Sequence, residues 1–296
     1  MSNAITTITK YLPLLDQVYA QASCSAILDT PNALVRETAD AKTVLIAQTS
    51  MSGLGDYSRA DGFVSGDLTL TWKPYTFTYD RGRTFQIDAM DDAETMGLAF
   101  GSLAGEFVRT KVTPEIDAVR FAKYAAESGT TNGGKLTKEN AVEAITTAEI
   151  TMEDKEISLE NCVLFLTPTV AGHIKNDTEH FQRTLVPSEN PNRNFGTFDG
   201  MPVVKVPSSR FRCDVMTLSG KDAEASGGYS AGGDPINFMI IDRSAVIQLV
   251  KHGKIRVFDP DTNQSADAYK VDYRIYHDAW VLDNKKDGIY CHVDAE

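Results

Sequence analysis

The longest stretch of helical periodicity in the chain runs from residue 84 to residue 128. One stripe of large apolar side chains recurs at helical spacing: Met96, Phe100, Leu103 and Phe107. A second face, about 130° round the helix by the 3.6-residue period, holds small or β-branched residues: Gly97, Gly101, Gly105, Val108 and Val112. Asp91 and Asp92 have the residue type of N-caps. The pattern predicts a central helix that is covered on two sides.

Three glycines in register make the second face informative. Each costs about 1 kcal/mol relative to alanine inside a helix, so their spacing implies that another backbone approaches closely. That backbone belongs either to the core of the same subunit or to a neighbouring chain. Membrane-type pairing through glycines is disfavoured, because Glu94, Glu106 and Arg109 interrupt the apolar run.

Pro114 divides this periodic stretch. Thr113, Pro114 and Glu115 suit the N-cap, N1 and N2 positions of a second helix, whose buried face would continue with Ile116 and Val119. Whether bent or broken, a rod from Asp92 to Glu127 would be about 50 Å long at 1.5 Å per residue. This length predicts an elongated subunit.

A Gly/Ser/Asp-rich segment precedes the rod and leads into alternating residues. Leu68, Leu70 and Trp72 alternate with threonines, and after Lys73-Pro74 the alternation resumes at Tyr75, Phe77 and Tyr79. The period of two predicts two extended strands in a long hairpin-like excursion. An isolated pair of strands is only marginally stable in water, so it needs a surface to pack on. That surface lies either in its own domain or on another chain.

The remaining patterns alternate between strand and helix. We expect strands at 41–48, 160–166, 201–206, 236–241 and in at least two runs after Lys254, and helices at 13–20, 137–148, 167–175 and 243–249. Residues 128–135, 180–199 and 219–234 are predicted to be turns and loops. The fold class is therefore α+β, with a middle region at about 150–250 flanked by parts of the rod's domain.

The composition of the chain argues against several classes of protein. The 296 residues carry a formal charge of −12, which argues against a dedicated nucleic-acid binder. The four cysteines, Cys24, Cys162, Cys213 and Cys291, have no paired spacing and fit reduced thiols in a cytoplasm. Neither a signal peptide nor a transmembrane segment is predicted.

Motifs for catalysis or cofactors fail on inspection. The segment from Asp259 opens like a calcium loop, but Gln264 and Lys270 occupy the positions that require glycine and glutamate. Gly53-Leu54-Gly55 lacks the helix that would receive a phosphate. The five histidines are not clustered with cysteines or carboxylates at ligand spacing. We therefore predict no catalytic residue, no metal site and no cofactor.

The order of the parts carries a resemblance. An arm with ITKYLPLLDQVY is followed by SGLGDYSRADGF, an aromatic-threonine hairpin, DRGRTFQIDAMDDAET, EFVRTKVTPEIDAVRFAKYA and a closing DPDTNQSADAYKVDYRIYHDAWVLDNKKDGIY. This order resembles a major capsid protein of a tailed bacteriophage with the HK97-like fold. The resemblance extends over nearly the whole chain and is strongest at 52–128 and 236–290.

The resemblance implies a domain plan. Residues 1–53 would be the N-terminal arm, 54–83 the E-loop hairpin, 84–154 the P-domain with its spine helix, 155–250 the A-domain, and 251–296 the C-terminal strands of the P-domain. The hairpin would find its partner on the adjacent subunit. The expected inter-subunit residues are at the hairpin and its base: Trp72, Lys73, Tyr75, Phe77, Arg81 and Arg83.

It also implies partners and a location. Copies of the chain would form hexamers and pentamers of an icosahedral shell around double-stranded DNA, in a virion assembled in the host cytoplasm. Portal and scaffolding proteins are expected, with DNA held by nonspecific proximity and no contact with a membrane. Some relatives cross-link an E-loop lysine, but nothing about Lys73, the one lysine of the hairpin, indicates reactivity.

Two alternatives remain. An encapsulin-like nanocompartment shell would use the same fold around an enzyme cargo. A cytosolic enzyme with an unrecognised site would instead be a monomer or small oligomer with a concave polar pocket.

Overall fold

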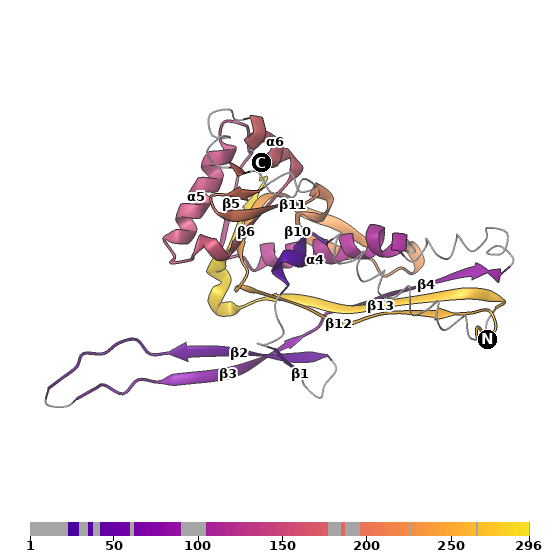
Figure 1. Ribbon diagram of the computed structural model, residues 1–296, viewed down its shortest axis with the longest axis horizontal. Coiled ribbons are helices and arrows are strands. Elements are labelled where there is room, and N and C mark those ends of the chain that lie inside the picture. Colours follow the sequence, from indigo (N-terminus) through magenta and orange to yellow (C-terminus); the bar gives the residue numbers. More distant parts are fainter. Residues whose placement is uncertain are drawn as a thin grey trace. The chain divides into compact units, whose positions relative to one another are not determined.

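The computed structural model describes residues 23–29, 35–37, 42–59, 62–89, 105–176, 185–186, 196–224, 226–264 and 266–295. The chain divides into two compact units, one from Pro31 to Asp80 and the other comprising the residues before and after it (Figure 1). Several expectations lie outside the described residues: the helix at 13–20, the caps Asp91 and Asp92, and the stripe from Met96 to Leu103 with Gly97 and Gly101.

The smaller unit is a three-stranded antiparallel sheet in the order β1-β2-β3, made of Val35–Glu37, Thr43–Met51 and Leu68–Thr76. Strands β2 and β3 pair along their whole length, from Thr43 opposite Thr76 to Met51 opposite Leu68. We call this pair, residues 43–76, the long hairpin. A hairpin built from 68–72 and 75–79 is therefore wrong, because β3 runs through Lys73-Pro74 and takes its partner from residues before the glycine-rich segment.

Pro74 fits inside β3 because β3 is the edge strand among the described strands. The N–H of Ser52 donates to the carbonyl of Asp67 and the N–H of Phe77 donates to that of Lys42, both at 2.9 Å. Backbone groups of alternate residues point to the same side of a strand, so odd-numbered residues face β2 and even-numbered ones face the free edge. Pro74 is even-numbered, and its missing N–H costs the ladder nothing.

The larger unit is built on an eight-stranded mixed sheet. Its main order is β5-β14-β11-β6-β9-β8-β7, and β10 pairs separately with β11. The strands, in chain order, are β5 Thr130–Gly133, β6 Cys162–Leu166, β7 Leu185–Val186, β8 Thr197–Phe198, β9 Met201–Lys205, β10 Arg212–Thr217, β11 Tyr229–Asp242 and β14 Ile289–Val293. The C-terminal strand β14 thus pairs with β11 from the middle of the chain.

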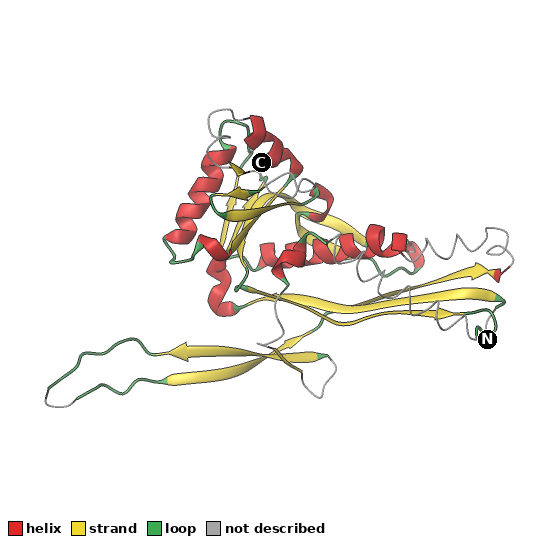
Figure 2. Ribbon diagram, in the orientation of Figure 1, coloured by secondary structure: helices red, strands yellow, loops and turns green. Residues whose placement is uncertain are grey.

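Each face of this sheet packs on helices (Figure 2). Along the fully buried β6, Leu164 and Leu166 belong to one apolar cluster, with α5 Ala141–Glu153 and α6 Pro168–Asn176. Val163 and Phe165 belong to the other cluster, with α4 Thr113–Ala126. Period-two alternation in a strand that is buried on both faces gives this continuous apolar run.

A second antiparallel sheet of three strands has the order β12-β13-β4. These are Val246–Phe258, Ala268–Val281 and Tyr79–Asp88. Ile275 of β13 packs against Ile116 of α4 and against Val112, which directly precedes α4. A helix at 243–249 is therefore wrong, because residues 243–245 form a turn and β12 begins at Val246.

The helix does not break at Pro114. Residues 105–126 are continuously helical, with a π turn at Val108–Val112 that leads directly into α4. Both the N–H and the hydroxyl of Thr113 donate to the carbonyl of Val108, five residues back. This wider spacing lets the chain continue past a proline that cannot donate. The predicted buried face is confirmed, because Ile116 and Val119 are buried.

Two segments differ from the prediction because they pair with other strands. Residues 130–133 form β5 beside β14, and residues 229–234 extend β11 to pair with β10, although both segments were expected to be loops. Thr167 caps α6 as predicted, with its hydroxyl accepting from the N–H of Val170 at 3.3 Å. Cross-strand pairing is a long-range contact, so local composition did not reveal it.

Candidate inter-subunit surfaces

One face of the long hairpin carries a strip of exposed apolar side chains. Leu68, Leu70 and Trp72 alternate along β3 with 70%, 58% and 37% of their surface exposed, and Met51, opposite Leu68, is also exposed. We call these four residues the apolar strip. Exposed apolar patches of this kind mark interaction surfaces, because soluble monomers rarely expose large ones.

The loop that joins the two strands continues this exposure. Leu54, Tyr57, Phe63 and Val64 are all exposed. We call these four residues the tip. The rings of Tyr57 and Phe63 lie 4.9 Å apart, and the backbones of Ser58 and Gly62 bond to each other in both directions. The tip is therefore an exposed apolar surface with one aromatic contact of its own, and it belongs to the same unit as the apolar strip.

The hairpin residues expected at an interface fall into two groups. Trp72 belongs to the strip, and Lys73 places its ammonium 5.7 Å from the ring of Tyr75, on the opposite face. Phe77, in contrast, is buried within the chain. Its backbone N–H donates to the carbonyl of Lys42, so this residue extends the strand pairing at the base of the long hairpin.

Arg81 and Arg83 lie in the larger unit, on β4. Nε of Arg81 contacts Oε1 of Glu115 at 2.5 Å, and its Nη2 donates to the carbonyl of Gly228 at 3.0 Å. The guanidinium of Arg83 lies beside Gly220, where an added Cβ would be 2.9 Å from Nη1. Arg81 thus forms an ion pair with Glu115 of α4.

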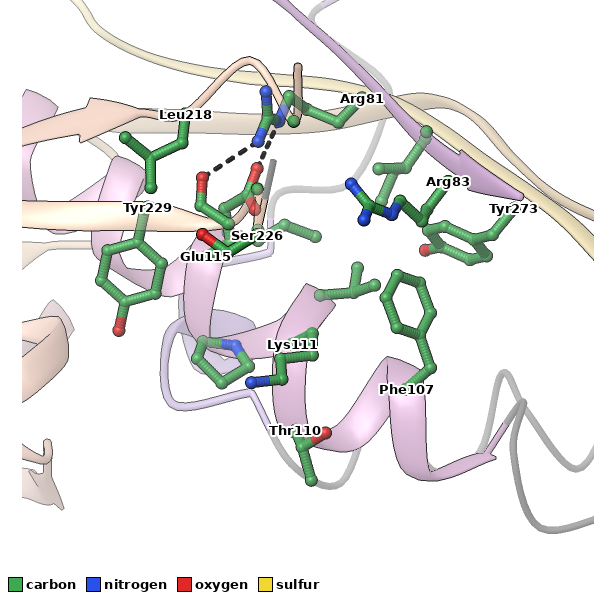
Figure 3. A pocket seen from close by; sticks show the side chains of 18 of the residues that line it. Arg81, Arg83, Phe107, Thr110, Lys111, Glu115, Leu218, Ser226, Tyr229 and Tyr273 are labelled. Atoms are coloured by element: carbon green, nitrogen blue, oxygen red, sulfur yellow. Dashed lines mark hydrogen bonds and ion pairs between the residues drawn. The ribbon is translucent and has the colours of Figure 1, made fainter. Parts of the chain in front are cut away.

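Both arginines line a cavity of about 740 Å³ in the larger unit (Figure 3). Phe107 and Tyr273 lie at one side of it, with ring centroids 5.8 Å apart, and Lys111 projects from the π turn. Burial, and then the positive charges of Arg120, Lys123 and Arg81, lower the pKa of His277 to about 3, so its imidazole is neutral at pH 7. The charge of this cavity therefore comes from its arginines, Lys111 and Glu115.

A third feature is the buried carboxylate of Asp117 on α4. It accepts hydrogen bonds from the hydroxyls of Ser23 and Ser25 at 2.8 and 2.7 Å, and from the backbone N–H of Cys24 at 2.9 Å. Arg210 lies 3.3 Å away. Asp117 thereby fixes residues 23–25 to the helix, a role that the sequence analysis missed because it depends on contact between distant segments.

Most of the apolar strip and the tip were not among the predicted interface residues. The alternation of Leu68 and Leu70 was part of the strand prediction, but the predicted interface residues were aromatic or charged. The signal that could have found them was the apolar-threonine alternation, which predicts an apolar face on a strand with few neighbours.

Among the described residues, no group of three or more histidine, cysteine or acidic side chains is placed to hold a metal ion. In the same part of the chain, no helix is both long and apolar enough to cross a membrane.

Among known proteins, the chain is similar to solved structures and not to family models or curated sequences. No protein-family model and no curated protein sequence matches the chain. Solved structures do match: a chain from Mycobacterium phage Che8 has a TM-score of 0.60 at 14% identity, covering 85% of this chain and 84% of that one. The capsid structure of cyanophage P-SCSP1u gives 0.60 at 15% identity, covering 91% and 87%. The head structure of Helicobacter pylori bacteriophage KHP40 gives 0.61 at 13% identity, covering 92% and 90%.

The chain has the HK97-like capsid fold. The likeness extends over most of both chains, so the fold expected from the order of parts is confirmed. In this HK97-like chain, the long hairpin and the unit with the eight-stranded sheet are the two compact units. At these identities the likeness establishes the fold alone.

Proposed function

We propose that this chain is the major capsid protein of a tailed bacteriophage. Copies associate into hexamers and pentamers of an icosahedral shell that encloses double-stranded DNA, and the virion capsid is the location of the protein after assembly in the host cytoplasm. The main observation behind this proposal is that the apolar strip and the tip are exposed and lie together in the smaller of the two compact units. The fold of phage capsid and head structures supports it.

Assembly would work by shared burial. Each apolar side chain that passes from water into a subunit interface contributes about 1.5–3 kcal/mol when fully buried. Obligate interfaces of this kind bury several thousand Å² in total. The strip and the tip supply apolar area that the subunit leaves exposed, and the protein acts through this association without catalysing a reaction.

The domain plan and the other partners belong to the same proposal. Residues 54–83, which contain the connecting loop and β3 of the long hairpin, would serve as the E-loop, and residues 84–154, 155–250 and 251–296 as P-domain, A-domain and closing P-domain strands. A separate scaffolding protein and a portal protein would take part in assembly. DNA would be held by nonspecific proximity, because a chain of charge −12 repels phosphate overall.

The test is assembly of the expressed full chain, followed by size-exclusion chromatography and negative-stain microscopy. We expect particles in the megadalton range. The tip variant Leu54→Ser/Phe63→Ser/Val64→Ser should fold normally, because these side chains are exposed, but should not form closed shells. The matched control is Ile150→Ser, which removes an exposed apolar side chain from α5. A wild-type protein that stays a compact monomer, with melting that responds to small ligands, would contradict the proposal.

A further inference from the structure

The edge of β3 that faces away from β2 borders no other strand among the described residues, and it presents backbone groups to a further strand. Leu68, Leu70 and Trp72 are even-numbered, so their N–H and C=O groups point away from β2. Pro74 also lies on this side and offers only its carbonyl. The usable edge therefore runs from Leu68 to Trp72 and ends at the proline.

The sequence at this edge is complementary to itself when it is reversed. In an antiparallel pair centred on Leu70, Leu70 faces Leu70 of a second copy and Leu68 faces Trp72. Thr69 faces Thr71 in the same arrangement. Threonine-threonine pairs are among the cross-strand pairs that stabilise sheets, and a Leu68–Trp72 pair would bury apolar surface of both side chains.

Charge complementarity fixes the same register. Asp67 precedes this segment and Lys73 ends it, so each aspartate faces the lysine of the second copy. Both side chains are exposed. A shift of two residues in either direction would remove both oppositely charged pairs, and like charges directly opposite each other are destabilising.

We propose that β3 pairs antiparallel with β3 of a second copy, about a two-fold axis that passes between the two Leu70 residues. Leu68, Leu70 and Trp72 each exchange both backbone hydrogen bonds with their partners, about six bonds in all. The two-fold axis is perpendicular to the sheet, so the two apolar strips lie on one face of a four-stranded sheet, β2-β3-β3-β2. The contact is isologous, with the same residues on both sides.

The inference rests on the proposed self-association, and it names a contact that this association would contain. It also gives Lys73 a role that needs no covalent chemistry. The lysine sets the register, together with Asp67, and Pro74 limits the length of the pairing.

The test uses single cysteine variants of the full chain. Thr69 and Thr71 are exposed and face each other only between copies, as a non-hydrogen-bonded pair whose Cα atoms would be about 4.5 Å apart. We expect Thr69→Cys and Thr71→Cys, co-expressed and oxidised with copper-phenanthroline, to give a disulfide-linked dimer that joins residue 69 to residue 71. Peptide mass spectrometry identifies the linkage against the four native cysteines.

Each variant expressed alone is the matched control for register. Neither Thr69→Cys nor Thr71→Cys alone should give more than about a tenth of the yield of the mixture, because neither faces itself. Equal or higher yields from one variant alone, or no dimer from the mixture when circular dichroism shows both variants folded, would overturn the proposal.

Charge reversal provides an independent measurement in the same assay. Asp67→Lys or Lys73→Asp should lower the yield of the mixed dimer about five- to tenfold, since either change places like charges opposite each other twice. The double variant should return it to within about twofold. Lys221→Asp, at an exposed lysine outside the hairpin, is the control. Failure of the double variant to recover, with normal folding, contradicts the register.

The two proposals can fail separately. Megadalton particles without a 69–71 cross-link overturn the β3 pairing and leave the capsid function in place. A 69–71 cross-link in dimers, without any larger particle, supports the pairing and contradicts the shell.

Discussion

Glu149 is a carboxylate that α5 carries into the interior of the larger unit. It is only 4% exposed, and its Oε1 accepts no hydrogen bond from any described residue. Burial, and then the negative charges of Asp199 and Glu153, raise its pKa from 4.5 to about 7. Desolvation disfavours the charged form, so the folded protein holds a proton on this group that the unfolded chain releases.

We predict that this residue makes stability fall as the pH rises. Between pH 4.5 and pH 7 the folded state binds the proton and the unfolded state does not, so the free energy of unfolding decreases across this window and levels off above it. The free energy of unfolding of Glu149→Gln should therefore exceed that of the wild type at pH 8 by about 3 kcal/mol, with the difference shrinking toward pH 4.5. Urea denaturation at several pH values measures it.

The control for that measurement is Glu143→Gln, at an exposed position of the same helix. Its effect should be small and the same at every pH. A Glu149→Gln difference that does not depend on pH would show that the pKa of this carboxyl is the same in the folded and unfolded states.

At the scale of the element, the helix from residue 105 to residue 126 shows how a proline can be tolerated. The sequence pattern was compatible with a break in the helix at Thr113-Pro114. In the structure the helix continues, because a π turn at Val108–Val112 leads directly into α4. Gly105 lies in the first turn of the described helix. A Cβ added there would meet no described atom of other elements within 4 Å. Of the two explanations for the glycines, contact with a neighbouring chain therefore stays open at this position.

We predict that the hydroxyl of Thr113 stabilises this π turn. It is buried and donates to the carbonyl of Val108 at 3.1 Å, so Thr113→Val should lower the free energy of unfolding by about 1 kcal/mol. The matched control is Thr110→Val, which removes a similar hydroxyl bond, to Glu106, at an exposed site. Thermal unfolding of both variants decides the point, and equal effects at the two sites would contradict the role of burial.

At the scale of the whole molecule, the two compact units differ in how much of their apolar surface is buried. The larger unit buries its apolar residues on both faces of a sheet, whereas the long hairpin leaves its apolar strip in water. A two-stranded hairpin gains too little burial of its own to be stable in isolation, so this arrangement favours association.

Trp72 should report that association. The chain has two tryptophans, Trp72 and Trp280, and Trp280→Phe leaves only the one on the apolar strip. On assembly we expect the fluorescence of this variant to shift to shorter wavelength, because the indole passes from partial exposure into an interface. The complementary variant, Trp72→Phe, is the control and should shift less. Assembly without any shift would show that the strip remains in water.

Elements with a local cause could be predicted from the amino-acid sequence. The fully apolar β6, the Thr167-Pro168 start of α6 and the buried face at Ile116 and Val119 follow from periodicity and capping. The order of these elements was also sufficient for the fold class and the capsid resemblance, because both depend on the succession of parts.

Features that depend on contacts between distant segments became known from the three-dimensional structure. It gave β3 its partner in β2, turned residues 229–234 into a strand beside β10, and placed Glu115 against Arg81. It also separated Phe77, which is buried, from Leu68 and Leu70, which are exposed. Strand partners depend on residues far along the chain, so the local pattern of a segment can predict a strand or a buried face without identifying what pairs with it or covers it.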